Sequence, residues 1–233
     1  MVTQKFSYTW LKVICMGIIA SLANNVVILP SVKFISGLYL DTIFTAAAAF
    51  SGGLIPGLIS AVLTTVMYGI EYFIENGTPY FGAYYLYMLC SIAIVLLVRL
   101  FARFFPAECE SVRVIGGQGL SYNGKISQGS LFIMLAVLSL VMCIVVSIIG
   151  GFISAGITVF TGVVDKSGPP ETYFRLGFIR QGFSLTMSEI LARIPVNIAD
   201  KPIAVFGGYG IALLVKKIVN RYSARAKEPQ VAR

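Results

Sequence analysis

The sequence predicts an all-α integral membrane protein, a bundle of six transmembrane helices with the N and C termini cytoplasmic. Three observations support this: an apolar composition, six apolar segments close to spanning length, and an uneven distribution of Lys and Arg between the loops. The chain has 233 residues, 57% of them hydrophobic and 12% charged, with a mean hydropathy of +0.85, whereas soluble domains carry about 25% charged residues. Because a span needs about 20 residues, we expect one transmembrane domain over 1–233 and no soluble catalytic or nucleotide-binding domain.

The apolar segments are the expected helices. The first, at about 10–29, shows no cleavage pattern, so we expect a membrane helix and not a removable signal peptide. The others lie at about 34–50, 56–74, 83–105, 130–160 and 185–219, with an outer loop at 161–184 and a basic cytoplasmic tail at 220–233. The fifth is too long for one perpendicular span at about 1.5 Å per residue, so we expect it to tilt, to break near Gly150 and Gly151, or to protrude. The outer loop is either a plain connector or a lid over an outward-facing pocket.

Lys and Arg are concentrated on one predicted side of the membrane. The two ends of the chain and the loop after the fourth helix carry twelve, and the opposite loops carry four: Lys33, Lys166, Arg175 and Arg180. Because cytoplasmic loops are enriched in Lys and Arg, we expect both termini in the cytoplasm. We also expect the protein to lie in the cell membrane of a prokaryote. Topology thus accounts for the net charge of +8. We expect no nucleic-acid partner, and contact of the basic tail with anionic membrane lipid.

Histidine is absent and the cysteines are scattered. Without histidine the chain lacks the commonest general base and the commonest metal ligand. Cys15, Cys90, Cys109 and Cys143 lie in different segments and form no CxxC pair, so we interpret them as packing residues. We therefore expect no metal, no cofactor, no catalytic residues and no enzymatic activity.

A polar stripe marks the sixth segment. Its members are four, four and three residues apart, which places them on one face of a helix: Glu189, Arg193, Asn197 and Asp200. The simpler interpretation is an ion pair between Glu189 and Arg193 on a face that packs against other helices. The functional interpretation adds Pro195 and Pro202, which each remove an amide donor and are expected to kink the helix. Irregular backbone is tolerated at membrane depth where it lines a cavity.

Asp41 stands in the second segment within the apolar run LYLDTIFTAAAAF. A carboxylate costs about 2.5 to 3.5 kcal/mol at the centre of a spanning helix on insertion scales, so we expect it to be functional or paired, with Arg193 or Lys201 as the partner. Most polar and aromatic residues fall in the outer half of the predicted bundle, as in a small-molecule pocket. The candidate substrate-binding residues are Asn24, Asp41, Thr42, Thr45, Glu71, Tyr84, Arg193, Asn197 and Asp200. For the tyrosines alone, an interfacial aromatic belt is the simpler interpretation.

Small residues recur at four-residue spacing in the first segment. Gly17 and Ser21 are four apart, as are Ala20 and Asn24, and this spacing lets helix backbones approach closely. The pattern predicts either internal packing or a stripe that docks another membrane protein, with Gly17, Ala20 and Ser21 as the docking residues.

Two stretches resemble a known family. GLYLDTIFTAAAAFSGGLIPGLISAVLT, and RIPVNIADKPIAVFGGYGIALLV in the last helix, resemble the substrate-binding S component of energy-coupling factor (ECF) transporters, six-helix proteins with both ends in the cytoplasm. The resemblance implies a subunit that captures a vitamin-like micronutrient from the outside. It also implies association with a transmembrane coupling (T) subunit and two cytoplasmic ATPase subunits. The family's docking stripe in the first helix is Ala-x-x-x-Ala, and Gly17-x-x-x-Ser21 stands in its place here.

The residues leave other classes of function open. A transmembrane sensory or receptor module has similar small-residue helices, but it is normally fused to a cytoplasmic output domain, and here the chain stops shortly after Lys217. A proton-coupled secondary transporter for a small polar solute would use the carboxylates, although the two halves show no convincing inverted repeat. The charges available suit a zwitterion, an anion or a neutral heterocycle as the substrate.

Overall fold

The computed structural model describes residues 2–28, 40–77, 82–115, 127–162 and 170–225, and these form helices and no strand. The all-helical prediction is therefore confirmed. In chain order the elements are α1 (Val2–Ala23), the π-helical turn η1 (Asn24–Ile28), the 3₁₀ turn η2 (Leu40–Thr42), α3 (Ile43–Gly52), α4 (Leu54–Asn76), the 3₁₀ segment η3 (Gly82–Tyr87), α5 (Met88–Phe104), α6 (Pro106–Glu110), α7 (Gln128–Thr161), α8 (Pro170–Arg180) and α9 (Leu185–Arg225).

Five segments are long and apolar enough to cross a membrane, as in a multi-pass membrane protein: Trp10–Val27, Leu54–Asn76, Gly82–Phe104, Gln128–Thr161 and Leu185–Ser223. The predicted second span, 34–50, is not among them. Its described part is η2 and α3, and α3 has 10 residues, which is about 15 Å of helix against a hydrocarbon core of about 30 Å. Residues 34–39 lie outside the described part of the chain, so six full-length spans stay a prediction.

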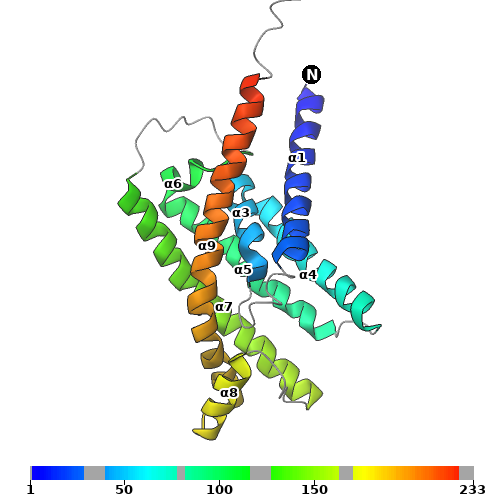
Figure 1. Cartoon of the computed structure of the whole chain (residues 1–233), viewed down its shortest axis with the longest axis vertical. Coiled ribbons are helices and arrows are strands. Elements are labelled where there is room, and N and C mark those ends of the chain that lie inside the picture. The colour runs from blue at the N-terminus through cyan, green and yellow to red at the C-terminus, as the bar shows by residue number, and fades with distance from the viewer. Residues whose placement is uncertain (1, 29–39, 78–81, 116–126, 163–169, 226–233) are drawn as a thin grey trace, which may run out of the picture.

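The short helix α3 lies at the centre of the bundle, in contact with α1, α4, α5 and α9 (Figure 1). Eight of its ten residues are buried. Its run of four alanines lets α9 approach so closely that a Cβ added to Gly208 would lie 2.9 Å from the Ala46 Cβ and 3.0 Å from the Ile43 carbonyl oxygen. At the other end of α3, Phe50 packs edge-on against Tyr209, with ring centroids 5.4 Å apart. α3 is therefore a core helix and not a lipid-facing one.

α7 and α9 form the largest helix contact and cross obliquely (Figure 1). α7 is continuous over 34 residues, about 51 Å, so the expected break near Gly150 and Gly151 is wrong. These glycines instead let α9 pack closely against α7. A Cβ added at Gly151 would lie 2.8 Å from the Ile190 backbone nitrogen, and a Cβ added at Gly150 would lie 3.3 Å from Arg193 Nη1. A helix this long tilts or protrudes from a bilayer, as expected.

Two boundaries in the second half of the chain differ from the sequence prediction. The predicted outer loop 161–184 contains α8, and α9 continues helically to Arg225, into the predicted tail. α9 also runs through Pro195 and Pro202 as one continuous helix of 41 residues. Pro195 and Pro202 each lack an amide hydrogen-bond donor, yet the predicted kinks do not interrupt α9, which packs against α7 and α3.

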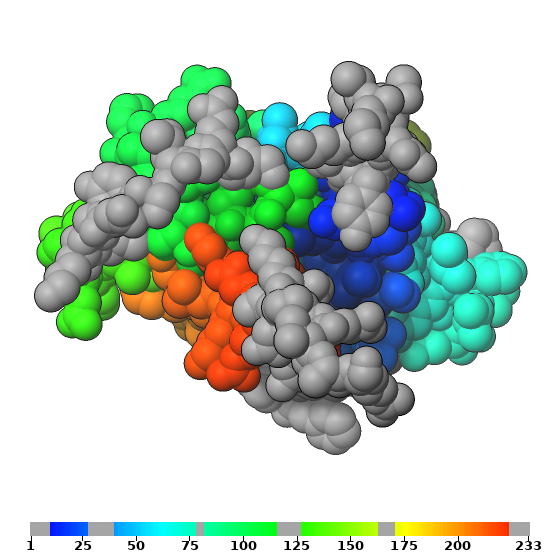
Figure 2. All heavy atoms as spheres, turned by 90° about the horizontal axis from the view of Figure 1, so that it is seen from above, coloured from blue at the N-terminus to red at the C-terminus, as the bar shows by residue number. Residues whose placement is uncertain are grey.

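The described ends of the chain lie at the same end of the bundle, and α8 lies at the opposite end (Figure 1). Figure 2 views the end with the termini, where the α6 and α7 region lies on one side of α9 and α1 on the other. At this end the chain after α6 is held to the core, because the Val114 backbone N–H donates to the Ser51 carbonyl oxygen at 2.6 Å. The Ser111 and Tyr209 hydroxyls are 2.8 Å apart in the same region.

Two of the four cysteines, Cys109 and Cys143, are buried as expected of packing residues, whereas Cys15 is exposed and Cys90 is half-buried. All four are free, and Cys109 of α6 lies in the hydrophobic core cluster. Burial raises the pKa of the Cys109 thiol to about 12, which keeps it protonated and unreactive at neutral pH. Among the described residues no group of three or more His, Cys, Asp and Glu is arranged to hold a metal ion.

Candidate functional site

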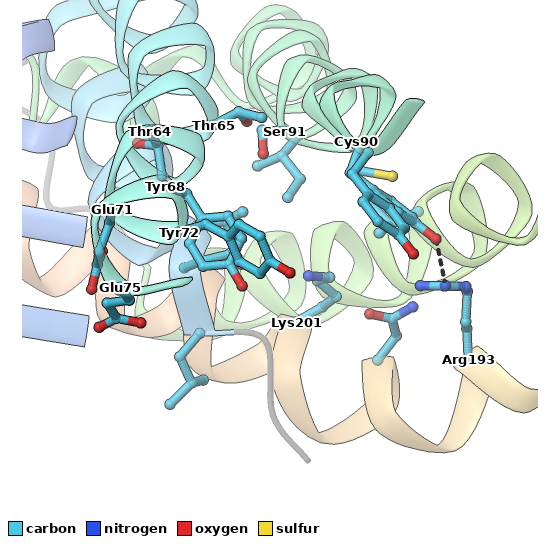
Figure 3. A pocket seen from close by; sticks show the side chains of 18 residues that line it. Thr64, Thr65, Tyr68, Glu71, Tyr72, Glu75, Cys90, Ser91, Arg193 and Lys201 are labelled. Carbon is cyan, nitrogen blue, oxygen red and sulfur yellow. Dashed lines mark hydrogen bonds between the residues drawn. The ribbon is translucent and has the colours of Figure 1, made fainter. Parts of the chain in front are cut away.

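A cavity of about 450 Å³ lies between α4, α5 and α9 (Figure 3), with η2, η3 and α7 completing its wall. Its lining residues are Leu40, Asp41, Thr42, Thr64, Thr65, Tyr68, Glu71, Tyr72, Glu75, Tyr84, Tyr87, Cys90, Ser91, Ile94, Val146, Arg193, Asn197 and Lys201. The lining residues of α4 begin at Thr64, near the middle of that helix, and those of α9 belong to its first half, so the cavity lies in the half of the bundle remote from the termini (Figure 1). Its volume falls in the range of small-molecule sites.

The α9 wall of the cavity consists of Arg193, Asn197 and Lys201. These residues are four apart, so they stack on one face of the helix. Asn197 Nδ2 donates to Ser147 Oγ of α7 at 2.9 Å, which fixes the amide against the neighbouring helix. Arg193 and Lys201 are the two cations that line the cavity.

Arg193 is held by partners on two other elements. Its Nη2 donates to the Tyr87 hydroxyl at 3.1 Å, and its guanidinium carbon lies 5.3 Å from the centroid of the same ring. Its Nη1 is 3.6 Å from Glu171 Oε1 of α8. Figure 3 shows Arg193 reaching from α9 toward the α5 side of the cavity. The guanidinium is thus oriented before any ligand binds.

Lys201 lies deep in the bundle beside Asp200. Lys201 is 2% exposed and Asp200 is 0% exposed, and the Lys201 ammonium donates to the Asp200 carboxylate. Asp200 Oδ1 has no hydrogen-bond partner among the described residues. Asp41 lines the same cavity within electrostatic range of Lys201. An ammonium and two carboxylates therefore gather at this end of the cavity, where isolated charge is costly.

Six of the nine predicted substrate-binding residues line the cavity: Asp41, Thr42, Glu71, Tyr84, Arg193 and Asn197. The other three, Asn24, Thr45 and Asp200, do not. Asp200 lies behind Lys201 as its ion-pair partner. Asn24 and Thr45 belong to a buried hydrogen-bonded network that reaches the lining through Thr64.

The predicted ion pair between Glu189 and Arg193 is wrong. Glu189 Oε1 pairs instead with Arg175 Nη1 of α8 at 3.0 Å, both side chains being buried, while Arg193 pairs with Glu171. Two ion pairs therefore seat α8 on α9, and one of them ends on a residue of the cavity wall. α8 belongs to the predicted outer loop 161–184, for which the sequence analysis left two interpretations, a plain connector or a lid.

Sequence reasoning missed Thr64 and Tyr68 of the α4 wall, although Tyr72 and Glu75 were among the polar and aromatic residues expected in the outer half of the bundle. Thr64, Tyr68, Tyr72 and Glu75 recur at intervals of three and four residues, so they share one helix face, and all of them line the cavity. In η3, the three-residue spacing of Tyr84 and Tyr87 likewise places both rings on one face of the 3₁₀ segment. Tyr87 was not among the candidate residues. Lys201 was considered only as a partner of Asp41, yet it lines the cavity itself.

The predicted docking residues Gly17, Ala20 and Ser21 are buried inside this chain, which corrects their assignment as a docking stripe. A Cβ at Gly17 would lie 2.6 Å from Ile59 Cγ2 of α4, and Ser21 Oγ donates to Met67 Sδ at 3.3 Å. The four-residue spacing therefore serves the contact between α1 and α4. The face of α1 that stays exposed carries larger apolar residues such as Ile19 and Leu22.

Comparison of the chain with protein-family models, with curated proteins and with solved structures gave no match. What the site does is therefore argued from its own geometry. A cavity with three carboxylates, an ammonium, a guanidinium, an amide and four tyrosine rings on its wall is suited to bind and orient a small polar molecule.

Proposed function

We propose that this chain is the membrane-embedded substrate-capture subunit of an ECF-type importer, which binds a small vitamin-like micronutrient from the outside. The observation that carries the proposal is the cavity of about 450 Å³ with charged side chains from α9 and η2 on its wall. Charged side chains inside a membrane domain are expensive and mark substrate pathways. A cavity of this size encloses a molecule of vitamin dimensions.

The side from which the substrate enters is proposed from charge. The two ends of the chain and the loop after the fourth predicted helix together carry twelve of the 18 Lys and Arg residues, and by the positive-inside rule such segments are cytoplasmic. The cavity lies in the half of the bundle remote from those ends (Figure 1). Capture from the outside is the direction that agrees with both features.

The partners are proposed from the family resemblance and from what the sequence lacks. The sequence contains no complete phosphate-binding GxxxxGK[ST] motif, because Ile126 follows Gly119-x-x-x-x-Gly124-Lys125 where the motif has Ser or Thr. The energy for transport would therefore come from two cytoplasmic ATPase subunits through a transmembrane coupling subunit. The surface that meets the coupling subunit is not the Gly17 to Ser21 stripe, because that stripe is buried against α4.

A proton-coupled secondary transporter is the second candidate. It is favoured by one observation, the juxtaposition of Asp41, Asp200 and Lys201 in the interior of the bundle. Intramembrane carboxylates of this kind serve as proton relays in transporters. Substrate uptake into proteoliposomes that is driven by a pH gradient, in the absence of ATP and of any other subunit, would favour this candidate over the capture subunit.

The capture function is tested by purifying the protein in mild detergent, releasing any bound molecule by denaturation and identifying it by mass spectrometry. We expect one defined small molecule, bound without chemical turnover, and co-purification of a coupling subunit with two ATPases. Asp41→Ala should reduce its occupancy, while Glu110→Gln, which removes a carboxylate outside the cavity, should not. Absence of any bound molecule, together with no binding in a vitamin screen, would reject capture. Association with a signalling protein in place of the ATPases would indicate a sensory module.

A further inference from the structure

The two positively charged side chains on the cavity wall already form ion pairs with carboxylates outside the wall. Its two cations each have a carboxylate partner that does not line the cavity: Lys201 is bonded to Asp200, and Arg193 lies 3.6 Å from Glu171. Neither cation therefore depends on Asp41 for neutralisation. Asp41 adds a further carboxylate to the wall, within electrostatic range of Lys201 but not bonded to it.

Asp41 and Thr42 present polar groups that the described residues leave without side-chain partners. Among the described residues, the hydrogen-bond partner of the Asp41 carboxylate is its own backbone amide. Thr42 is 4% exposed and its Oγ1 has no partner. Thr42 stands at the N-cap position of α3, where a threonine hydroxyl usually accepts a backbone hydrogen bond, yet it makes no such bond. Buried polar groups of native proteins are almost always satisfied, so this pair indicates a missing ligand.

The remaining recognition surface is aromatic. Tyr68 and Tyr72 extend from α4 toward Lys201 (Figure 3), whereas Glu71 and Glu75 lie on the edge of α4 farther from it. Across the cavity the rings of Tyr84 and Tyr87 are stacked, with centroids 6.5 Å apart. The face of a phenol ring attracts a cation, and an organic cation is commonly held by such rings together with a carboxylate.

We propose that the captured molecule carries a positively charged group, which binds between the Asp41 carboxylate, the Thr42 hydroxyl and the tyrosine rings. This inference rests on the capture function and adds the charge class of the ligand, an organic cation with an apolar or aromatic body. Three carboxylates line the cavity, Asp41, Glu71 and Glu75, and a cation bound beside Asp41 balances a negative charge that the α9 ion pairs do not balance. An anion in the same place would meet that carboxylate and the negative faces of the rings.

The test uses the full chain in lipid nanodiscs and two bicyclic aromatic probes of similar size and opposite charge, N-methylquinolinium and 2-naphthoate. Affinities are measured by calorimetric titration, with empty nanodiscs as the reference for partition into lipid. We expect the wild-type protein to bind N-methylquinolinium at least tenfold more tightly than 2-naphthoate. Asp41→Asn should abolish this preference, and the matched control Glu110→Gln should keep it. Thr42→Val, which preserves shape, should weaken cation binding several-fold.

The outcomes separate the charge class from the capture function. Equal or reversed affinities in the wild-type protein, or an unchanged preference in Asp41→Asn, overturn the proposal. If Asp41→Asn does not yield monodisperse protein, the wild-type preference and Thr42→Val decide. If neither probe binds, the charge of the co-purified molecule decides: a cation supports the proposal, and a neutral molecule or an anion rejects it while leaving capture intact. A protein that binds no small molecule at all rejects capture itself.

Discussion

Asn24 of η1 donates a hydrogen bond from its Nδ2 to Thr45 Oγ1 of α3 at 2.9 Å. The same Nδ2 donates to Thr64 Oγ1 of α4 at 3.2 Å, and Asn24 Oδ1 accepts from the Phe44 backbone N–H at 3.1 Å. Both amide hydrogens and the oxygen are thus engaged, and one buried side chain joins three elements. Asn24 is therefore a structural residue beside the cavity, and its hydrogen bonds fix the start of α3, where Asp41 and Thr42 stand.

Asn24→Ala should lower the stability of the folded protein by about 1 to 3 kcal/mol, because it leaves the part-buried Phe44 N–H without its acceptor. The measurement is the thermal unfolding midpoint in detergent. Asn76→Ala is the matched control, since Asn76 is exposed and donates only to the Tyr72 carbonyl oxygen. Equal midpoints for the two variants would contradict the role assigned to Asn24.

Ser21→Leu should destabilise the protein itself, because Ser21 is fully buried against Met67 of α4 and extra methylene groups in a packed core cost about 1 to 3 kcal/mol. The measurement is the unfolding midpoint of the isolated chain. Ile19→Leu, on the exposed face of α1, is the control and should leave it unchanged. Normal stability of Ser21→Leu combined with loss of a partner subunit would restore the docking interpretation.

Gly151→Ala and Gly156→Ala should change stability in opposite directions although both lie in α7. At Gly151 the added methyl group meets the Ile190 backbone within 2.8 Å, whereas at Gly156 nothing lies within 4 Å. The first variant must push α7 away from α9. The second removes the conformational freedom of a helical glycine, worth about 0.5 to 1 kcal/mol. Unfolding midpoints that shift in the same direction would show that the α7 and α9 contact is looser than described.

Glu189→Gln should loosen α8 from the bundle, because it removes the carboxylate that pairs with the buried Arg175, and breaking a buried ion pair costs about 3 to 5 kcal/mol. Hydrogen exchange of the α8 amides measures the effect, and faster exchange confined to α8 is the expected result. Arg180→Gln, at the exposed end of α8, is the control. Unchanged exchange in Glu189→Gln would show that apolar contacts alone hold α8 in place.

Arg193→Ala should weaken binding of the co-purified molecule at least tenfold, about 1.4 kcal/mol. The variant removes a group from the cavity wall and frees Tyr87 and Glu171 from their partner. Arg193→Lys keeps the charge but not the planar guanidinium that bonds the Tyr87 hydroxyl while pairing with Glu171, so we expect an intermediate affinity. Wild-type affinity in both variants, measured by calorimetric titration, would leave Arg193 only the role of holding α8.

The polar face of α9 illustrates how far sequence reasoning reached. Spacing placed Arg193 and Asn197 on one face, and both line the cavity. The same spacing predicted that Asp200 and Glu189 belong to this face, whereas Lys201 lines the cavity and those two residues do not. A helix turns about 100° per residue, so Asp200 and Lys201 differ in direction by more than a quarter turn, and a pattern cannot fix which of them faces the centre. Glu189 faces α8, a helix whose position depends on contacts distant in sequence.

The sequence by itself determined the all-helical membrane character of the chain and the residues with unusual chemistry for such a place, because composition and helical spacing are local properties. Tertiary structure alone decided which of those residues meet. It made α3 a short central helix, turned the small face of α1 toward α4, and gave Arg193 and Glu189 separate partners on α8. Such pairings depend on how whole helices pack against one another, and that packing is set by side chains far apart in the chain.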